Sequence, residues 1–402
     1  MLVDDSRSVV EMVSALLRQE GHEVEIRHSS LEALRDAESI APDCILLDLM
    51  MPEMEGFELL RRLRDIPALV AVKIVILSSK SYDYDRRRAR QLGADGYLIK
   101  PINAQTFIAE LHRLLSKHSV LSYWGVRGTL PVPGPGSVRY GGNTSCVTFE
   151  AEGEPMIIID AGSGIKRLSD DIFARGAPRI TGKLLLSHAH WDHINAFPFF
   201  GPLYVQGNEF EVLGPAHSDR TVREIVTAQM EDVYFPVTTR EFGARVYYRD
   251  LREERFLVGN VQVDTMLLKH PGACLGYRLT LNDTKVCYIT DNELYPEGNP
   301  YHDPEFEARL VNFVREADVL ITDTTYLDYE YPKKIGWGHS CVSEVVRIAD
   351  RAAVKNLHLF HHDPDQDDNK IDEKLASAVQ ALAARNSKTV CAAPAEGSKI
   401  IL

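Results

Sequence analysis

The chain has 402 residues, enough for two or three domains. Apolar residues make up 45% and charged residues 26%, proportions that exclude a disordered or fibrous protein. The net charge of −13 argues against DNA binding and against an anionic membrane surface. There is neither an apolar run of the roughly 18 residues that a membrane span needs nor a basic, secretory N-terminus. We therefore expect a cytoplasmic protein with no membrane partner, whose six scattered cysteines are reduced.

The first part of the chain alternates short apolar runs with segments of helical periodicity. This alternation predicts a doubly wound parallel sheet of the (βα)5 type, with its functional site at the carboxyl ends of the strands. The predicted strands are 1–3, 23–28, 44–49, 73–79 and 96–100, and the predicted helices are 8–21, 30–39, 57–65, 83–93 and 103–117. The first strand has only three residues before an acidic pair, so either it is short or the start lies upstream.

Polar side chains follow several of these strands. Asp4 and Asp5 come after the first strand, Asp48 and Ser78 stand at the ends of two later strands, and Lys100 ends the fifth. Three carboxylates at one edge repel one another unless a cation holds them, and oxygen ligands favour Mg²⁺. A carboxylate beside Mg²⁺ can act as a nucleophile and form an aspartyl-phosphate, with the lysine against a phosphoryl oxygen.

This pattern resembles the receiver domain of two-component response regulators. The matching residues include the Asp4/Asp5 pair, the segment 46–56 around Asp48, and Tyr97 three residues before Lys100. The resemblance implies that Asp48 accepts a phosphoryl group from a cognate sensor histidine kinase. The other implied residues are the Mg²⁺ ligands Asp4, Asp5, Asp48 and the Met50 carbonyl, the switch pair Ser78 and Tyr97, and Lys100, which contacts the phosphoryl group.

Residues 119–402 form a second predicted domain, joined to the first domain, 1–118, without a Gly/Ser-rich or Pro-rich tether. Strands and helices are mixed here, which predicts an α/β sandwich of two sheets covered by helices. The predicted strands are 145–152, 156–162, 183–188, 210–215, 263–270, 276–281, 285–291 and 317–323. The predicted helices are 165–175, 195–200, 219–230, 305–316, 341–353 and 371–385.

The sharpest motif in this domain lies directly after a predicted strand. His188, His190, Asp192 and His193 stand within six residues, a spacing that suits metal ligands better than packing. Imidazole and carboxylate ligands favour Zn²⁺, Mn²⁺ or Fe. Further candidates also follow strands, and they are weak singly but strong together: Asp160, His270, Asp291 and the pair His361/His362.

In this order the motifs resemble the metallo-β-lactamase superfamily. The resemblance implies an αββα fold with two divalent metals and covers residues 122–402. One metal is then held by His188, His190 and His270, the other by Asp192, His193 and a later histidine, with Asp291 bridging. The last motif favours His361 over His362 as that histidine, and Asp160 becomes an outer partner that orients a ligand.

Two later loops narrow the choice of branch. Asp323, Thr324 and Thr325 follow a strand, and His339 and Ser340 precede a helix. This pair of loops resembles those of the transfer-RNA 3′-processing endonuclease RNase Z and its phosphodiesterase relatives. The resemblance implies that His339 protonates the leaving oxygen and that Asp323 orients the His339 ring. Ser340 or Ser343 can instead cap the helix. The candidate catalytic residues are His339, Asp323 and Asp192, the last also a metal ligand.

The predicted function is a phosphodiesterase controlled by phosphorylation of Asp48. The segment 215–256 shows no counterpart of the long Gly/Pro-containing arm that grips tRNA, which favours a small phosphodiester such as a cyclic nucleotide. The alternatives are an ester or lactone hydrolase, a ribonuclease, and a non-catalytic metal-binding module. A homodimer is expected only because members of both families commonly form dimers.

Two polar segments remain open. A glycine-rich stretch with Arg127, Arg139 and Asn143 either binds a phosphate or base or simply forms turns. The acidic stretch 363–373 is expected to be a solvated loop that enters a helix.

Overall fold

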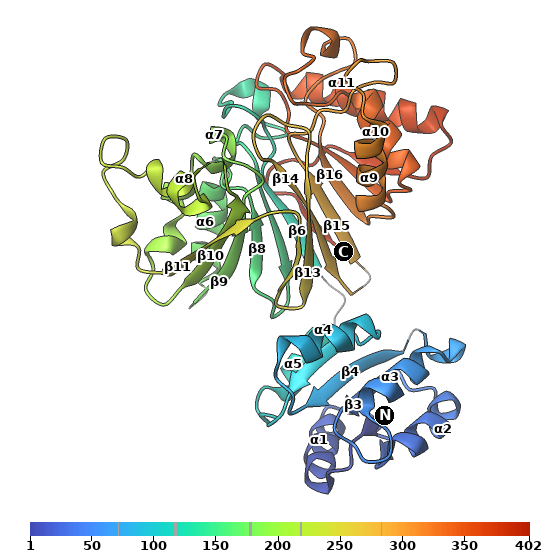
Figure 1. Cartoon of the computed structure of the whole chain (residues 1–402). Coiled ribbons are helices and arrows are strands. Elements are labelled where there is room, and N and C mark those ends of the chain that lie inside the picture. The colour runs from blue at the N-terminus through green and yellow to red at the C-terminus, as the bar shows by residue number, and fades with distance from the viewer. Residues whose placement is uncertain (71, 116–118, 177–178, 218, 283) are drawn as a thin grey trace. The chain divides into compact units, whose positions relative to one another are not determined.

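The computed structural model describes residues 1–70, 72–115, 119–176, 179–217, 219–282 and 284–402. It divides into two compact units, Met1–Lys117 and His118–Leu402 (Figure 1). The predicted boundary between residues 118 and 119 adjoins residues 116–118, which lie outside the described residues, so its position stays a prediction.

The first unit is a five-stranded parallel sheet in the order β2-β1-β3-β4-β5, which confirms the doubly wound prediction. Along β4, Ile74 and Ile76 face one apolar core while Val75 and Leu77 face the other, because side chains alternate across a strand. The strands are β1 Leu2–Val3, β2 Ile26–Arg27, β3 Cys44–Asp48, β4 Lys73–Ser78 and β5 Gly96–Ile99; the helices are α1 Arg7–Gln19, α2 Ser30–Ile40, α3 Gly56–Arg64, α4 Asp83–Gln91 and α5 Phe107–Leu115.

The second unit is built on two seven-stranded mixed sheets. Their orders are β11-β10-β9-β8-β7-β6-β19 and β12-β13-β14-β15-β16-β17-β18. The strands are β6 Ser119–Gly125, β7 Cys146–Ala151, β8 Met156–Ile159, β9 Thr181–Leu185, β10 Glu209–Pro215, β11 Arg245–Leu251, β12 Arg255–Val258, β13 Val261–Leu267, β14 Leu275–Leu281, β15 Thr284–Ile289, β16 Val319–Asp323, β17 Asn356–Phe360, β18 Val390–Ala392 and β19 Lys399–Ile401.

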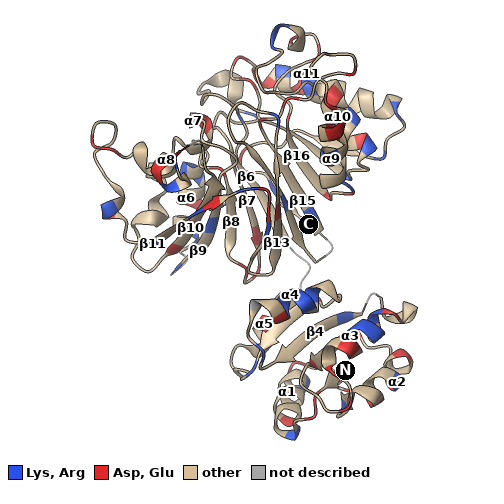
Figure 2. Ribbon diagram, in the orientation of Figure 1, with Lys and Arg blue, Asp and Glu red and all other residues tan. Residues whose placement is uncertain are grey.

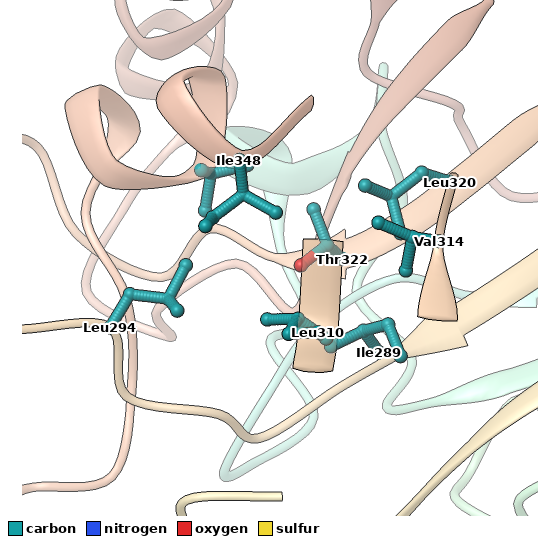
Figure 3. Close-up of a pocket in the computed structure, with 8 residues that line it drawn as sticks. Ile289, Leu294, Leu310, Val314, Leu320, Thr322 and Ile348 are labelled. Carbon is teal, nitrogen blue, oxygen red and sulfur yellow. The ribbon is translucent and has the colours of Figure 1, made fainter. Parts of the chain in front are cut away.

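Three apolar layers hold this unit together as an αββα sandwich, as predicted. The central layer joins the two sheets, for example through Phe149 and Tyr277. One outer layer packs helices against the first sheet and the other packs helices against the second. Figure 3 shows the outer layer on the second sheet, with Leu310 and Ile348 from two helices beside Leu320 and Thr322 of β16. The helices are α6 Ile165–Arg175, α7 Trp191–Ile194, α8 Val222–Ala228, α9 Pro304–Phe313, α10 Val342–Arg351 and α11 Asp368–Ala384.

Several local predictions differ from the structure. The helix expected at 195–200 is wrong: α7 ends at Ile194, and short 3-10 turns follow, each with a proline in its first turn. The edge strands β11, β12, β18 and β19 were not predicted, since short or charged edge strands lack a continuous apolar run.

Charge is spread over both units. Figure 2 shows basic and acidic residues interspersed over the sheets and helices, with basic residues gathered on α4. Within the described ranges, no helix has the length and apolarity that a bilayer span needs.

His358 on β17 is a buried titratable side chain whose Nδ1 lies 2.5 Å from the Tyr123 hydroxyl oxygen. Burial lowers the pKa of His358 to about 4, whereas an unfolded histidine has a pKa near ~6.5. Below about pH 6.5 this histidine is protonated in the unfolded chain, whereas in the folded protein it stays neutral down to about pH 4. Folding is therefore destabilised as the pH falls through this window.

We expect His358→Gln, which keeps a polar partner for Tyr123 but does not titrate, to reduce this sensitivity to acid. Between pH 7 and pH 5 the wild type should lose about 1–2 kcal/mol more unfolding free energy than the variant. Urea denaturation of both proteins at the two pH values, at equal metal content, measures the difference. Equal losses in the two proteins would contradict the prediction.

Candidate metal centre

Strand ends and the loops that follow them deliver the predicted metal ligands to one place. His188, His190, Asp192 and His193 follow β9, and Asp291 follows β15. His270 comes from the β13–β14 connection and His361 comes directly after β17. Ligands that leave neighbouring strands at the same edge meet there without any long connection.

The ligand atoms form two groups that share Asp291. In each group the candidate atoms all lie within 4.8 Å of one another. In the second group, His361 Nε2 lies 3.1 Å from an Asp192 oxygen and 3.2 Å from an Asp291 oxygen. The first group is His188, His190, His270 and Asp291; the second is Asp192, His193, Asp291 and His361. The structure thus brings all seven predicted ligands together, while their roles stay predictions.

The donor set fits divalent metals. His188 Nε2 is buried and finds no hydrogen-bond partner among the residues that the structure describes, although it faces Asp291 at 3.5 Å. Burial lowers the pKa of His188, His190 and His270, so these imidazoles are neutral and can donate a lone pair. Buried carboxylates beside neutral imidazoles match the preferences of Zn²⁺, Mn²⁺ and Fe.

Asp160 is buried next to the candidate ligand His193, and its predicted outer role stays a prediction. One oxygen lies 2.7 Å from His193 Nδ1 and accepts a 2.7 Å hydrogen bond from the Tyr288 hydroxyl. The other accepts the backbone N–H of Ser187, also at 2.7 Å. Its contact with His193 leaves Nε2 of that ring facing Asp192 and Asp291.

We expect Asp160→Asn to weaken metal binding by about 10- to 100-fold, the usual cost of losing such an outer partner. The amide can no longer accept with both oxygens, so the His193 tautomer is no longer fixed. Titration with a competing chelator measures the loss. The exposed Asp170→Asn is the matched control, and unchanged affinity in Asp160→Asn would refute the expectation.

The glycine-rich stretch that contains Arg127 and the loop before His339 also contact the ligands. The backbone N–H of Thr129 donates to Asp192 Oδ2 at 2.7 Å, and Thr129 has a positive φ of 66°. A Cβ on Gly128 would meet the His361 ring at 2.2 Å, and one on Gly338 would meet His270 Nδ1 at 2.3 Å. The glycines were visible in the sequence, but the contacts join distant segments.

His339 and Asp323 form a pair at the edge of the second group. His339 Nδ1 lies 2.8 Å from Asp323 Oδ2, and the His339 ring stacks on His361 with centroids 4.9 Å apart. Asp323 also accepts from the backbone and the hydroxyl of Thr325. Burial disfavours the charged ring, but the Asp323 carboxylate raises the pKa of His339 to about 9. The two predicted loops therefore meet, with their roles still predictions.

The serines of the second loop do not cap the helix. The N-cap of α10 is Cys341, which makes no side-chain cap hydrogen bond. Ser340 instead donates to the Asn292 carbonyl and accepts from the Leu294 N–H, which ties the His339 loop to the segment after β15. The capping alternative is wrong.

His361 and His362 have different surroundings. His361 points into the second ligand group, as the preference for it requires. His362 is buried with its ring 6.2 Å from that of Tyr140, and its two ring nitrogens have no hydrogen-bond partner within the described part of the chain.

The glycine-rich stretch serves the scaffold. Arg127 is fully buried and donates to the carbonyl oxygens of Gly141 and Gln366, so a role in binding phosphate is wrong for it. Arg139 pairs with Asp372 at 2.7 Å, and the Asn143 amide donates to Glu396. The stretch 363–373 is only partly solvated: Asp368 is buried, begins α11 and accepts the Arg139 N–H.

The acidic site of the first unit also assembles. Candidate oxygens of Asp4, Asp5 and Asp48 lie within 4.8 Å of one another. Lys100 Nζ lies 2.7 Å from Asp4 and 3.1 Å from Asp48. Burial raises the pKa of Asp4, although the hydrogen bond from Lys100 lowers it.

Ser78 and Tyr97 lie on neighbouring strands. Both contact Lys80: its N–H donates to Ser78 Oγ at 3.2 Å, and the Tyr97 hydroxyl donates to its carbonyl at 2.8 Å. The switch pair and the Met50 carbonyl stay predictions.

Comparison with known proteins matches both units. Residues 1–112 match the response regulator receiver domain, and residues 156–362 match the β-lactamase superfamily domain. The chain is 34% identical over 121 residues to the transcriptional regulatory protein TrcR of Mycobacterium tuberculosis, covering 30% of this chain and 46% of that protein. It is 36% identical over 117 residues to a CpxR homolog of Haemophilus influenzae, covering 29% and 50%. The chain spans about half the length of these relatives.

Solved structures agree on the second fold. The metallo-β-lactamase fold protein YhfI of Bacillus subtilis covers 71% of this chain and all of its own, with 17% identity and a TM-score of 0.52. A diphosphatase from the PhnP family covers 70% of this chain and 97% of its own, with 16% identity and a TM-score of 0.50. The chain belongs to the β-lactamase superfamily and carries a response regulator receiver domain before a domain of the metallo-β-lactamase fold.

Proposed function

We propose that the second unit is a phosphodiesterase with two divalent metals. The Asp323–His339 pair, 2.8 Å between Oδ2 and Nδ1 and adjacent to His361, carries the proposal. Hydrolysis of a phosphodiester expels an alkoxide from phosphorus, and an imidazole held at this distance from the metal ligands can give that alkoxide its proton.

In this proposal some residues bind the metals and others protonate the leaving group. The seven ligands described above would bind the two metals, which when present activate water and offset charge on phosphoryl oxygens. Asp323 accepts the Nδ1 proton of His339, so the other ring nitrogen is free to give its proton to the leaving oxygen. Asp192 serves as a ligand, held by the Thr129 N–H.

A small substrate such as a cyclic nucleotide remains our proposal, supported by the net charge of −13. The receiver class implies phosphorylation by a sensor kinase, and we propose that phosphorylation of Asp48 changes the hydrolase rate. Mg²⁺ at Asp4, Asp5 and Asp48, a dimer and a cytoplasmic location stay predictions.

The test compares substrate classes on the full chain loaded with Zn²⁺ or with Mn²⁺. We expect turnover of bis-p-nitrophenyl phosphate and of at least one cyclic nucleotide, but none of a lactone or thioester panel. A protein that carries two metals and hydrolyses only lactones or thioesters would overturn the proposal. A requirement for tRNA-length substrates would indicate a ribonuclease instead.

A further inference from the structure

Two of the three tryptophans are exposed beside the metal centre. Trp124 is buried, but Trp191 is 82% exposed and Trp337 is 58% exposed. Trp191 directly follows the ligand His190. Trp337 precedes Gly338, whose carbonyl oxygen lies 3.0 Å from His270 Nδ1, and stands two residues before His339. Because tryptophan is highly buried on average, exposed indoles at these positions call for a functional reason.

The backbone on both sides of Trp337 is fixed by one buried carboxylate. Glu293 accepts the N–H of Gly336 at 2.7 Å with one oxygen and that of Gly338 at 2.8 Å with the other. The Tyr331 hydroxyl donates to the first oxygen at 2.9 Å. Both glycines have a positive φ, 86° and 85°, which other residues adopt only with strain. The loop therefore has a defined shape, although the indole that it carries faces solvent.

A cation completes this surface. Lys334 Nζ lies 4.1 Å from the centroid of the Trp337 ring and 5.6 Å from that of Tyr326. A cation over an indole orders the ring and places positive charge on the loop that leads into His339. An ordered, exposed π-surface costs little entropy when a flat ligand stacks on it.

We propose that Trp337 is the stacking surface for a nucleobase carried by the phosphodiester substrate and thus determines specificity for nucleotides. The proposal rests on the proposed function, which it narrows from phosphodiesters to those bearing a base. Aromatic stacking is sequence-tolerant because each base has a π-face, so Trp337 selects for a base without selecting which one.

The test uses two probes that contain no diester and so need no turnover. Adenosine 5′-monophosphate and ribose 5-phosphate share the sugar and the phosphate but differ in the base. Calorimetric titration of the metal-loaded full chain should show that the wild type binds the nucleotide about 5- to 100-fold more tightly. Trp337→Ala should bring the ratio close to one with an unchanged Kd for ribose 5-phosphate, and Trp337→Phe should keep most of the preference.

The exposed Tyr247 on β11 supplies the matched control, since Tyr247→Ala removes an exposed aromatic ring outside the loop. Equal affinity of the wild type for the two probes overturns the proposal, and so does a preference that survives in Trp337→Ala. Hydrolysis of bis-p-nitrophenyl phosphate, measured separately, decides whether the protein is a phosphodiesterase. A failure of base recognition is therefore distinguishable from a failure of the proposed function.

Discussion

Replacing His339 with alanine is expected to lower kcat on a cyclic nucleotide by about 10²- to 10⁴-fold, the usual contribution of a positioned general acid. The metal content should not change if the two predicted ligand groups hold the metals, because neither includes His339; a metal held by the third group, Asp323, His339 and His361, would be lost. The expected loss depends on the leaving group. An alkoxide needs a proton to depart, whereas p-nitrophenolate departs without one.

The decisive measurement is therefore the ratio of two losses. Steady-state rates of the wild type and His339→Ala, at equal metal content, are compared on a cyclic nucleotide and on bis-p-nitrophenyl phosphate. We expect the loss to be at least about tenfold larger on the cyclic nucleotide. His22→Ala, an exposed histidine of the receiver unit, is the control. Equal losses on both substrates, or loss of metal, would show that His339 acts in another way.

The ligands of the metal centre were accessible from the sequence because their positions follow local rules. His188, His190, Asp192 and His193 stand on one turn, and the others directly follow apolar runs that had to be strands. Two sheets that bury their apolar faces against each other leave these ends at one edge. The choice of His361 over His362 came from the resemblance of the last motif to that of the metallo-β-lactamase superfamily, and His361 does lie in the second ligand group.

The supporting contacts were not accessible, because they join segments far apart in the chain. Nothing local distinguishes Arg127, a buried scaffold residue, from a phosphate-binding arginine, since its partners Gly141 and Gln366 follow 14 and 239 residues later. Glu293 gave no signal either, although its carboxylate fixes a loop more than 40 residues away. Asp368 was likewise expected to be solvated, but it is buried in the structure.

Asp48→Asn is expected to abolish phosphorylation of the receiver unit. Asp48 is nearly buried, with one oxygen 3.2 Å from the Met50 N–H and the other 3.1 Å from Lys100 Nζ. An asparagine amide keeps this size and one acceptor but is not a nucleophile toward phosphorus. Incubation with acetyl phosphate and Mg²⁺, followed by intact-mass analysis, should show one phosphoryl group on the wild type and none on the variant.

The exposed Asp65→Asn is the matched control, because it removes the same charge from the same unit away from the acidic site. A phosphoryl group that persists on Asp48→Asn would place the acceptor elsewhere. The same pair of proteins tests the proposed control of the hydrolase. If phosphorylation of Asp48 sets its rate, acetyl phosphate changes kcat in the wild type and in Asp65→Asn but not in Asp48→Asn. A response that survives in Asp48→Asn would mean that the phosphodonor acts at a site other than Asp48.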